Sequence, residues 1–146
     1  MSAEQVFSIS NSVALLGWLI LAALGWKRWA ASLVTGAILP LVFAVLYAAL
    51  IVAHWGETKG GFGSLASVGA LFSDQWLLLA GWVHYLAFDL FIGSWQVRDA
   101  RERGIPHALV IPSLILTFLF GPAGLLLYFV VRCARSRSLD LRLTRA

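Results

Sequence analysis

Two ionisable side chains, His84 and Asp89, lie inside one long apolar stretch of the sequence that runs from Gln75 towards His107. Ionisable groups in the middle of a membrane span are costly, and they mark functional sites more often than structural ones. Burying a carboxyl group away from water costs free energy when the group is an anion, so the neutral acid is favoured. A carboxylic acid that is neutral near pH 7 can transfer its proton in a reaction. We therefore predict that this pair is functional, with proton transfer as its chemistry.

Helix geometry separates the two side chains. Five residues at about 100° each place His84 and Asp89 about 140° apart around a regular helix, so they cannot both bind one ion. The pair therefore predicts a cavity between this helix and its neighbours rather than a chelate. The predicted ligand contacts lie on the two stripes that contain the pair, together with the deep tryptophan: Trp82, Phe88, Phe91, Gly93, Trp95 and Gln96. The predicted mouth of the cavity is Arg98, Asp99 and His107.

Other roles for these residues remain open. In a purely structural role, His84 and Asp89 would hydrogen-bond across the helix bundle. As metal ligands, His84, Asp89 and His107 offer nitrogen and oxygen atoms, but their spacing matches no compact metal-binding motif, and we predict no metal site. His54 and His107 close and open spans on opposite sides, so roughly 30 Å of hydrocarbon separates them. The sequence does not identify a cofactor.

The composition predicts a membrane protein. Of the 146 residues, 60% are hydrophobic and 12% are charged, whereas soluble domains are about half apolar and about a quarter charged. The apolar residues form long uncharged runs, which predict transmembrane helices at about residues 6–26, 30–54, 75–97 and 108–131. The predicted fold class is therefore all-α, a polytopic four-helix membrane bundle that forms a single domain over residues 1–146.

Proline and glycine predict where the helices are disturbed. Kinks are expected at Pro40 and Pro122, because proline removes a backbone donor. Pro122 leaves the carbonyl of Phe118 without its helical partner, which is tolerated at depth only where another group satisfies it. The glycine-rich residues 56–63 predict a loop, and residues 64–72 a short helix at the membrane interface.

Charged residues extend the third helix beyond the membrane. The pairs Arg98–Glu102 and Asp99–Arg103 have the four-residue spacing that supports a helix, and Gly104 and Pro106 are expected to end it.

Charge also predicts partners and orientation. The net charge is +4, and five arginines lie in the tail, residues 132–146, where they are expected to contact anionic membrane lipids. No motif or basic face accompanies them that would indicate nucleic-acid binding. Four spans place both termini on one side, with six basic residues there against five on the other, so we predict cytoplasmic termini.

The beginning of the chain bears on localisation. Glu4 and the absence of a basic residue before the first apolar run argue against a signal peptide, and no plastid leader precedes it. We therefore predict a multi-pass protein of the bacterial cytoplasmic membrane, with oligomers possible.

One stretch of the sequence has a familiar pattern. His84-Tyr-Leu-Ala-Phe-Asp89-Leu-Phe, followed by Asp99, His107 and Leu119-Phe-Gly-Pro-Ala-Gly124, resembles the abscisic-acid-deficiency-four-like family of small membrane proteins. The resemblance is specific over about residues 82–128. The plant members of this family have about four spans and are required to make neoxanthin from violaxanthin. The resemblance implies that the ligand is a carotenoid or a related isoprenoid lipid.

The resemblance also implies a reaction. Opening an epoxide to an allene requires an acid at the epoxide oxygen and a base for a vinylic proton. His84 and Asp89 would share these catalytic roles, while Phe91 and Trp95 would pack against the polyene end, which makes the protein an intramolecular isomerase. The alternatives are a non-enzymatic membrane accessory protein and a proton-coupled small-solute carrier with Asp89 as its gate.

Overall fold

The structure, a computed structural model, describes residues 1–57 and 59–136. Within these residues the chain forms helices and no strand, which confirms the predicted all-α fold class. The part of the predicted basic tail from residue 137 onward lies outside the described residues. The elements in chain order are α1 (Ala3–Leu24), the π-helix η1 (Ala30–Ile38), α2 (Leu39–His54), the 3₁₀ turn η2 (Trp55–Glu57), α3 (Leu65–Leu71), α4 (Gln75–Glu102), α5 (His107–Phe120) and α6 (Pro122–Ser136).

Three helices are long and apolar enough to cross a membrane: Ala3–Leu24, Ala30–His54 and Gln75–Glu102. They correspond to the spans predicted at residues 6–26, 30–54 and 75–97, and they support membrane association. The helix predicted over residues 64–72 is also present, as α3.

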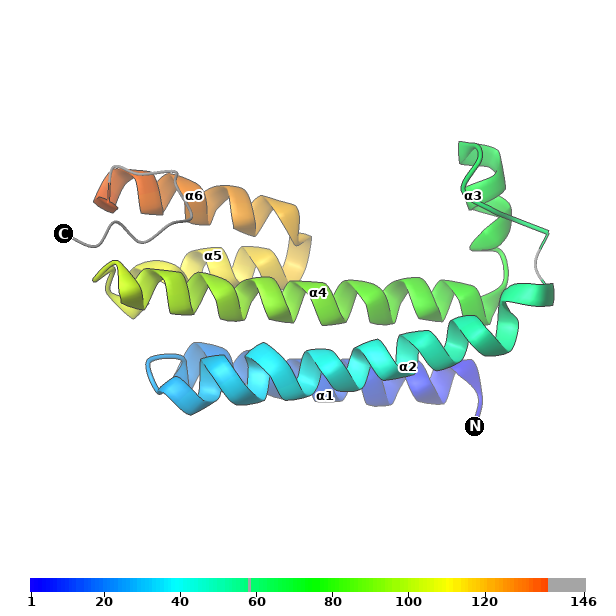
Figure 1. The fold of residues 1–146 in the computed structure, drawn as a ribbon, viewed down its shortest axis with the longest axis horizontal. Helices are drawn as coiled ribbons and strands as arrows, with labels where there is room; N and C mark the ends of the chain where they lie inside the picture. Colours follow the sequence, from blue (N-terminus) through cyan, green and yellow to red (C-terminus); the bar gives the residue numbers. More distant parts are fainter. Residues whose placement is uncertain (58, 137–146) are drawn as a thin grey trace.

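The fourth predicted span, residues 108–131, is not one helix, and the four-helix count is not confirmed. The chain breaks at Gly121 into α5 and α6, which pack against each other as a hairpin beside the second half of α4 (Figure 1). We call residues 107–136 the α5–α6 hairpin. Gly121 adopts a φ of 44°, a conformation that favours glycine, and Pro122 has no N–H with which to continue α5. Pro122 therefore reverses the chain rather than kinking one helix.

The hairpin determines where the last described helix ends. α5 has 14 residues and α6 has 15, so each is about 21–23 Å long and too short to cross roughly 30 Å of hydrocarbon. The N-terminus and the end of α6 consequently lie at opposite ends of the long axis (Figure 1). The prediction that both termini lie on one side counted residues 108–131 as a complete crossing, and the C-terminal residues that it concerns lie outside the described part of the chain.

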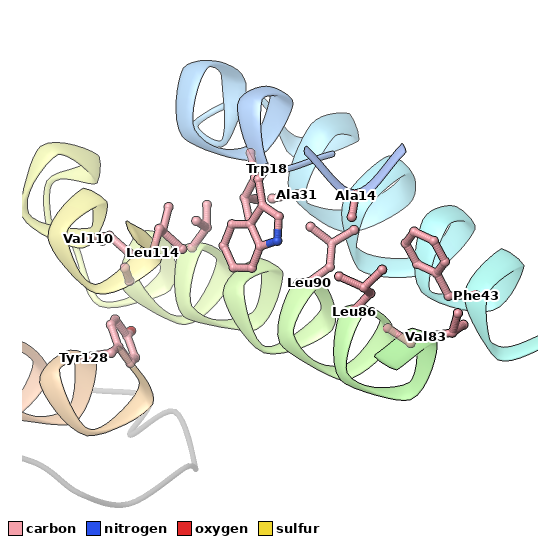
Figure 2. Packing of buried hydrophobic residues seen from close by; sticks show 14 of the residues in the cluster. Ala14, Trp18, Ala31, Phe43, Val83, Leu86, Leu90, Val110, Leu114 and Tyr128 are labelled. Atoms are coloured by element: carbon pink, nitrogen blue, oxygen red, sulfur yellow. The ribbon is translucent and has the colours of Figure 1, made fainter. Parts of the chain in front are cut away.

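The central helix is α4, which packs against α1, η1, α2, α5 and α6. The carboxylate of Asp74 caps its first turn by accepting hydrogen bonds from the N–H groups of Trp76 and Leu77 at 2.9 and 3.0 Å. Gly104, with a φ of 66°, ends it as predicted. The buried core along α4 includes Trp18 of α1 and Phe43 of α2 (Figure 2).

The disturbance predicted at Pro40 takes the form of the π-helix η1. Proline has no N–H to donate, and its ring crowds the carbonyl four residues back, so a wider turn before Pro40 relieves the conflict. The wider turn brings Thr35 against α4: its hydroxyl donates to the Ala30 carbonyl at 3.0 Å and accepts from the Ser94 hydroxyl at 2.7 Å. Both hydroxyl residues are fully buried, so η1 supplies a polar link inside the bundle.

Candidate functional site

A groove of about 630 Å³ lies between α1 and the first half of α4. Its volume is in the usual range for small-molecule sites, roughly 300–1,000 Å³. The polar residues Ser2, Glu4 and Gln75 line one end of the groove, near the starts of the two helices. Most of the remaining lining is apolar, which suits a lipophilic ligand.

Aromatic rings form the walls of the groove. The Trp82 indole N–H donates a hydrogen bond of 2.8 Å to the Asn11 side-chain oxygen, which ties α4 to α1. The Trp82 ring also contacts the rings of Phe7 and Tyr85, at centroid distances of 5.7 and 5.4 Å. Phe72, at the end of α3, packs on Gly81, where an added Cβ would lie 2.7 Å from its ring. The walls are therefore fixed by contacts between three helices.

The floor of the groove is Tyr85, which connects it to the α5–α6 hairpin. The Tyr85 hydroxyl donates to the backbone carbonyl of Phe118 at 3.5 Å. This carbonyl is the one that Pro122 deprives of a helical donor, so the expectation that another group satisfies it is met. The same hydroxyl interacts with the carboxyl group of Asp89, one turn further along α4.

Asp89 lies directly against the turn of the hairpin. A Cβ added at Gly121 would lie 2.9 Å from Asp89 Oδ1 and 3.1 Å from Oδ2. Asp89 Oδ2 is buried and has no hydrogen-bond partner among the described residues. A buried carboxylate with an unused oxygen is costly, so this group is suited to hold and transfer a proton where the floor of the groove meets the hairpin.

Replacing Gly121 with alanine should destabilise the protein by about 1–3 kcal/mol, because the positive φ strains any other residue, and the new methyl group would press on Asp89. The measurement is the free energy of unfolding in detergent micelles. Gly104→Ala separates the backbone strain from the contact with Asp89, because Gly104 also has a positive φ, 66°, but no atom lies within 4 Å of its added Cβ. Gly69→Ala, which also has open space and no positive φ, is the neutral control. Equal stability of the Gly121 and Gly69 variants would contradict this account of the turn.

The structure does not bring His84 and Asp89 together. His84 is exposed on the outside of α4, where its ring contacts those of Tyr47 and Phe88 at centroid distances of 5.7 and 4.7 Å. Asp89 faces the hairpin, in keeping with the predicted angle of about 140° between the two side chains. The catalytic roles of both residues stay predictions. Within residues 1–57 and 59–136, no three His, Cys, Asp or Glu side chains gather where they could hold a metal ion.

Of the predicted ligand contacts, all of which belong to the described part of α4, Trp82 lines the groove and the other five do not. Phe88 and Phe91 are 58% and 43% exposed and face outward. A Cβ at Gly93 would lie 2.7 Å from the Trp18 ring, so this glycine permits close packing of α1 on α4.

The last two predicted ligand contacts hold α4 to the hairpin. The Trp95 ring packs edge-on against Tyr128 at 5.4 Å. The buried Gln96 amide donates to the Thr117 hydroxyl at 2.9 Å. Their positions indicate structural contacts, and their predicted ligand-binding role is untested.

The residues predicted at the mouth of the cavity lie at the other end of α4 from the groove. Arg98 lies over the Phe91 ring, 5.8 Å from its centroid. His107 Nε2 bonds the backbone carbonyl of Ala22 at 2.9 Å, so it joins the start of α5 to α1.

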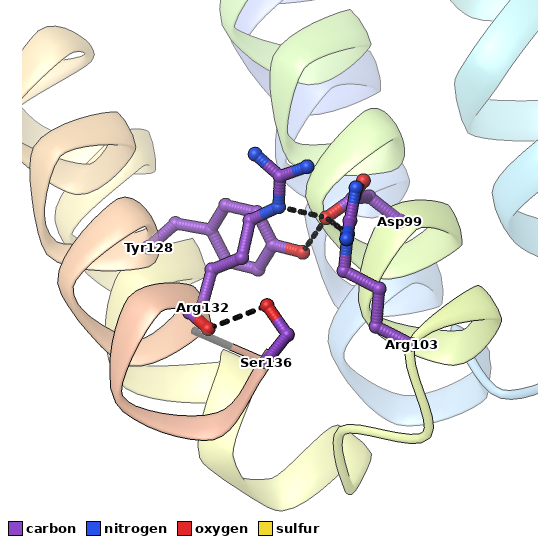
Figure 3. A network of polar contacts seen from close by, with 5 residues as sticks. All are labelled: Asp99, Arg103, Tyr128, Arg132 and Ser136. Carbon is purple, nitrogen blue, oxygen red and sulfur yellow. Dashed lines mark hydrogen bonds and ion pairs between the residues drawn. The ribbon is translucent and has the colours of Figure 1, made fainter. Parts of the chain in front are cut away.

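Asp99 is the centre of a buried network between α4 and α6 (Figure 3). Its carboxylate accepts from the Tyr128 hydroxyl at 2.6 Å and from Arg103 Nε at 3.0 Å. Arg132 Nε forms a second ion pair with it at 3.0 Å, and the Arg132 side chain is completely buried. The predicted pairing of Asp99 with Arg103 is confirmed. The network ties the far end of the hairpin to α4.

Sequence reasoning missed several residues of the groove. Tyr85 could have been found, because it precedes Asp89 by four residues and therefore shares its helix face. Gly121 with Pro122 was a visible break in an apolar run. Phe7 and Phe72 carry no local signal, because they reach the groove only through the packing of α1 and α3 on α4.

Comparison with known proteins gives a family match. The sequence model of the family described as ABA DEFICIENT 4-like matches residues 5–128, which include the groove, Asp89 and the turn of the hairpin. Among curated proteins, the chain is similar to Protein ABA DEFICIENT 4, chloroplastic, from Arabidopsis thaliana, with 27% identity over 100 residues. The alignment covers 63% of this chain and 44% of that protein, so the chain spans less than half of the length of this relative. No solved structure matches the chain.

Proposed function

The chain belongs to the ABA DEFICIENT 4-like family, and from this premise we propose that it binds a carotenoid or another isoprenoid lipid in the groove and isomerises it. The observation that carries the proposal is an apolar groove of about 630 Å³ whose floor, Tyr85, interacts with the carboxyl group of Asp89. Mostly apolar walls with a few converging polar groups are typical of small-molecule sites.

The dimensions of the groove suit one end of a long ligand. Gln75 and Tyr85 are ten positions apart and therefore about 15 Å apart along α4, so the groove takes one end group and the adjoining part of the ligand chain. The rings of Phe7, Phe72 and Trp82 would pack against the polyene or isoprenoid chain. The rest of the molecule would remain in the lipid.

The proposed chemistry is the opening of an epoxide to an allene, as the family resemblance implies. One proton is added to the epoxide oxygen as its C–O bond breaks, and one vinylic proton is removed, so the reaction is an isomerisation with no net proton change. Asp89 as the neutral acid supplies the first proton, and as the carboxylate it accepts the second. Asp89 thereby takes both of the acid–base roles that we predicted it would share with His84, and the Tyr85 hydroxyl is the group on the same face of α4 that interacts with its carboxyl group.

Replacing Trp82 with leucine should reduce carotenoid binding about tenfold, because the variant loses an aromatic wall worth roughly 1–1.5 kcal/mol. Bound pigment per protein is measured by absorbance after purification from detergent loaded with carotenoid. Phe88→Leu is the matched control, since Phe88 is 58% exposed and does not line the groove. Equal losses in the two variants, or no pigment bound by the unchanged protein, would contradict ligand binding in the groove.

A proton-coupled solute carrier is the second candidate. The observation that favours it is the hairpin, because two half-length helices that meet beside an acidic side chain in the middle of a span are typical of carriers. Flux into liposomes that depends on a pH gradient and is lost in Asp89→Asn would favour the carrier. Pigment conversion without such flux would favour the isomerase.

We propose that the protein acts within a membrane, with lipids as its surroundings. The bacterial cytoplasmic membrane stays our prediction for this location. The printed name of the Arabidopsis relative assigns that protein to the chloroplast, so the relative does not support a bacterial membrane.

A further inference from the structure

A second pocket, of about 250 Å³, lies at the opposite end of α4 from the groove. Its lining includes Trp26 from the loop after α1, Arg101 from the last turn of α4, and His107 from the start of α5. The candidate spans Ala3–Leu24 and Gln75–Glu102 both end here, so in a membrane the pocket would lie near the lipid headgroups. Trp26 is 53% exposed, as is typical of tryptophan at a membrane interface.

One guanidinium nitrogen of Arg101, a residue that lines this pocket, has no hydrogen-bond partner among the described residues. This atom, Nη1, is buried, donates no hydrogen bond and forms no ion pair among the described residues. Asp99, the buried acid nearest in sequence, is already bound by Arg103 and Arg132. Glu102 is exposed. Burying a guanidinium nitrogen without an anion costs free energy. An anion from outside the described residues would lower this cost.

The walls of the pocket are held in place by contacts of their own. His107 is fixed by its bond of 2.9 Å to the Ala22 carbonyl and by an edge-on contact with the Trp26 ring at 5.9 Å. A Cβ at Gly25 would lie 2.6 Å from the His107 ring, so the loop after α1 packs closely on α5. Lys27, next to Trp26 in the same loop, is exposed and adds positive charge to this end of the molecule.

We propose that this pocket binds a phosphate group, with the Arg101 guanidinium as its principal contact. Guanidinium groups match phosphate oxygens with two parallel hydrogen bonds, and the pocket lies where lipid phosphates lie. The phosphate belongs to an anionic lipid headgroup or to a soluble phosphate ester. The site is distinct from the groove, and its failure would leave the proposed isomerisation untouched.

The test measures the thermal unfolding midpoint of delipidated protein in detergent as phosphatidylglycerol or phosphatidylcholine is added. Phosphatidylglycerol should stabilise the unchanged protein more than phosphatidylcholine does, because a ligand that binds the folded state raises its stability. Arg101→Gln should weaken the apparent affinity for phosphatidylglycerol about tenfold to hundredfold, the effect of losing a charged hydrogen bond. Arg28→Gln is the matched control, because it removes an exposed arginine near the same end of the molecule.

Additional titrations identify the source of the phosphate, and a second variant tests whether a loss of binding results from misfolding. Glycerol phosphate and inorganic phosphate are titrated in the same way, and an Arg101-dependent shift with either would assign a soluble phosphate. A shift with phosphatidylglycerol alone would assign the lipid. Arg101→Lys, which keeps the charge but not the planar fork, should bind with intermediate affinity. Equal shifts with the two lipids and none with soluble phosphate, or equal losses in Arg101→Gln and Arg28→Gln, would overturn the proposal.

Discussion

Replacing Asp89 with asparagine is expected to lower the rate of isomerisation by about 10²–10⁴-fold, the contribution of a positioned acid–base group. The amide has nearly the same shape and can neither supply nor accept the proton. Because Asp89 Oδ2 has no hydrogen-bond partner among the described residues, the uncharged amide should leave folding stability unchanged or raise it slightly. The measurement is the conversion of violaxanthin, the epoxide that the family resemblance implies, followed by chromatography in detergent or vesicles.

His84→Ala is the informative comparison for this experiment. His84 is exposed on the outside of α4 and does not line the groove, so its removal should leave the rate within a few fold of the original. A loss in His84→Ala as large as in Asp89→Asn would favour the pair predicted from sequence over Tyr85 and Asp89. Conversion at the normal rate by Asp89→Asn would refute the proposed chemistry, although pigment binding in the groove would still be possible.

Removing the carboxylate of Asp99 should cause the largest loss of stability, about 3–5 kcal/mol, because it leaves buried positive charge without a counter-ion. The Arg132 side chain is 0% exposed and that of Arg103 is 7% exposed, so neither can turn into water without a change in packing. The free energy of unfolding of Asp99→Ala in detergent micelles tests this expectation.

Two further variants show whether the loss of stability in Asp99→Ala comes from the buried ion pairs. Glu102→Ala removes an exposed carboxylate from the same part of α4 and should cost less than about 1 kcal/mol, as surface charges usually do. Adding Arg132→Met to an Asp99→Leu variant should recover part of the loss, since apolar side chains can replace a buried ion pair. Similar losses in Asp99→Ala and Glu102→Ala would show that the network contributes little.

The sequence predicts much of this fold because hydropathy and helix signals are local. Uncharged runs located the helices that are long enough to span, and Gly104 marked the end of α4. The hairpin was not predicted, because the average hydropathy over residues 108–131 does not show that the chain reverses direction at a single residue. Pro122 indicates that the Phe118 carbonyl lacks its helical donor. The sequence did not identify the group that donates to it, the Tyr85 hydroxyl, which is 33 residues away.

The candidate site was predicted only in part, for a related reason. Asp89 and Trp82 stand out by residue type and by depth in a span, whereas Phe7 and Phe72 become part of the groove only through packing between helices. His84 stood out by the same argument as Asp89 but is exposed. Helix periodicity separates two faces of α4, but nothing in the sequence says which face the hairpin covers.

The break at Gly121 also changes the predicted number of membrane crossings from four to three. With three spans and a hairpin that returns to the side it entered from, the described basic residues near helix ends gather at one end of the molecule. These residues are Lys27, Arg28, Arg98, Arg101, Arg103, Arg132 and Arg135. The segment between α2 and α3, which contains Lys59, lies at the other end (Figure 1). With four crossings the counts nearly balanced, but with three the positive-inside rule favours a cytoplasmic basic end and a non-cytoplasmic N-terminus. The groove would then open towards the non-cytoplasmic leaflet.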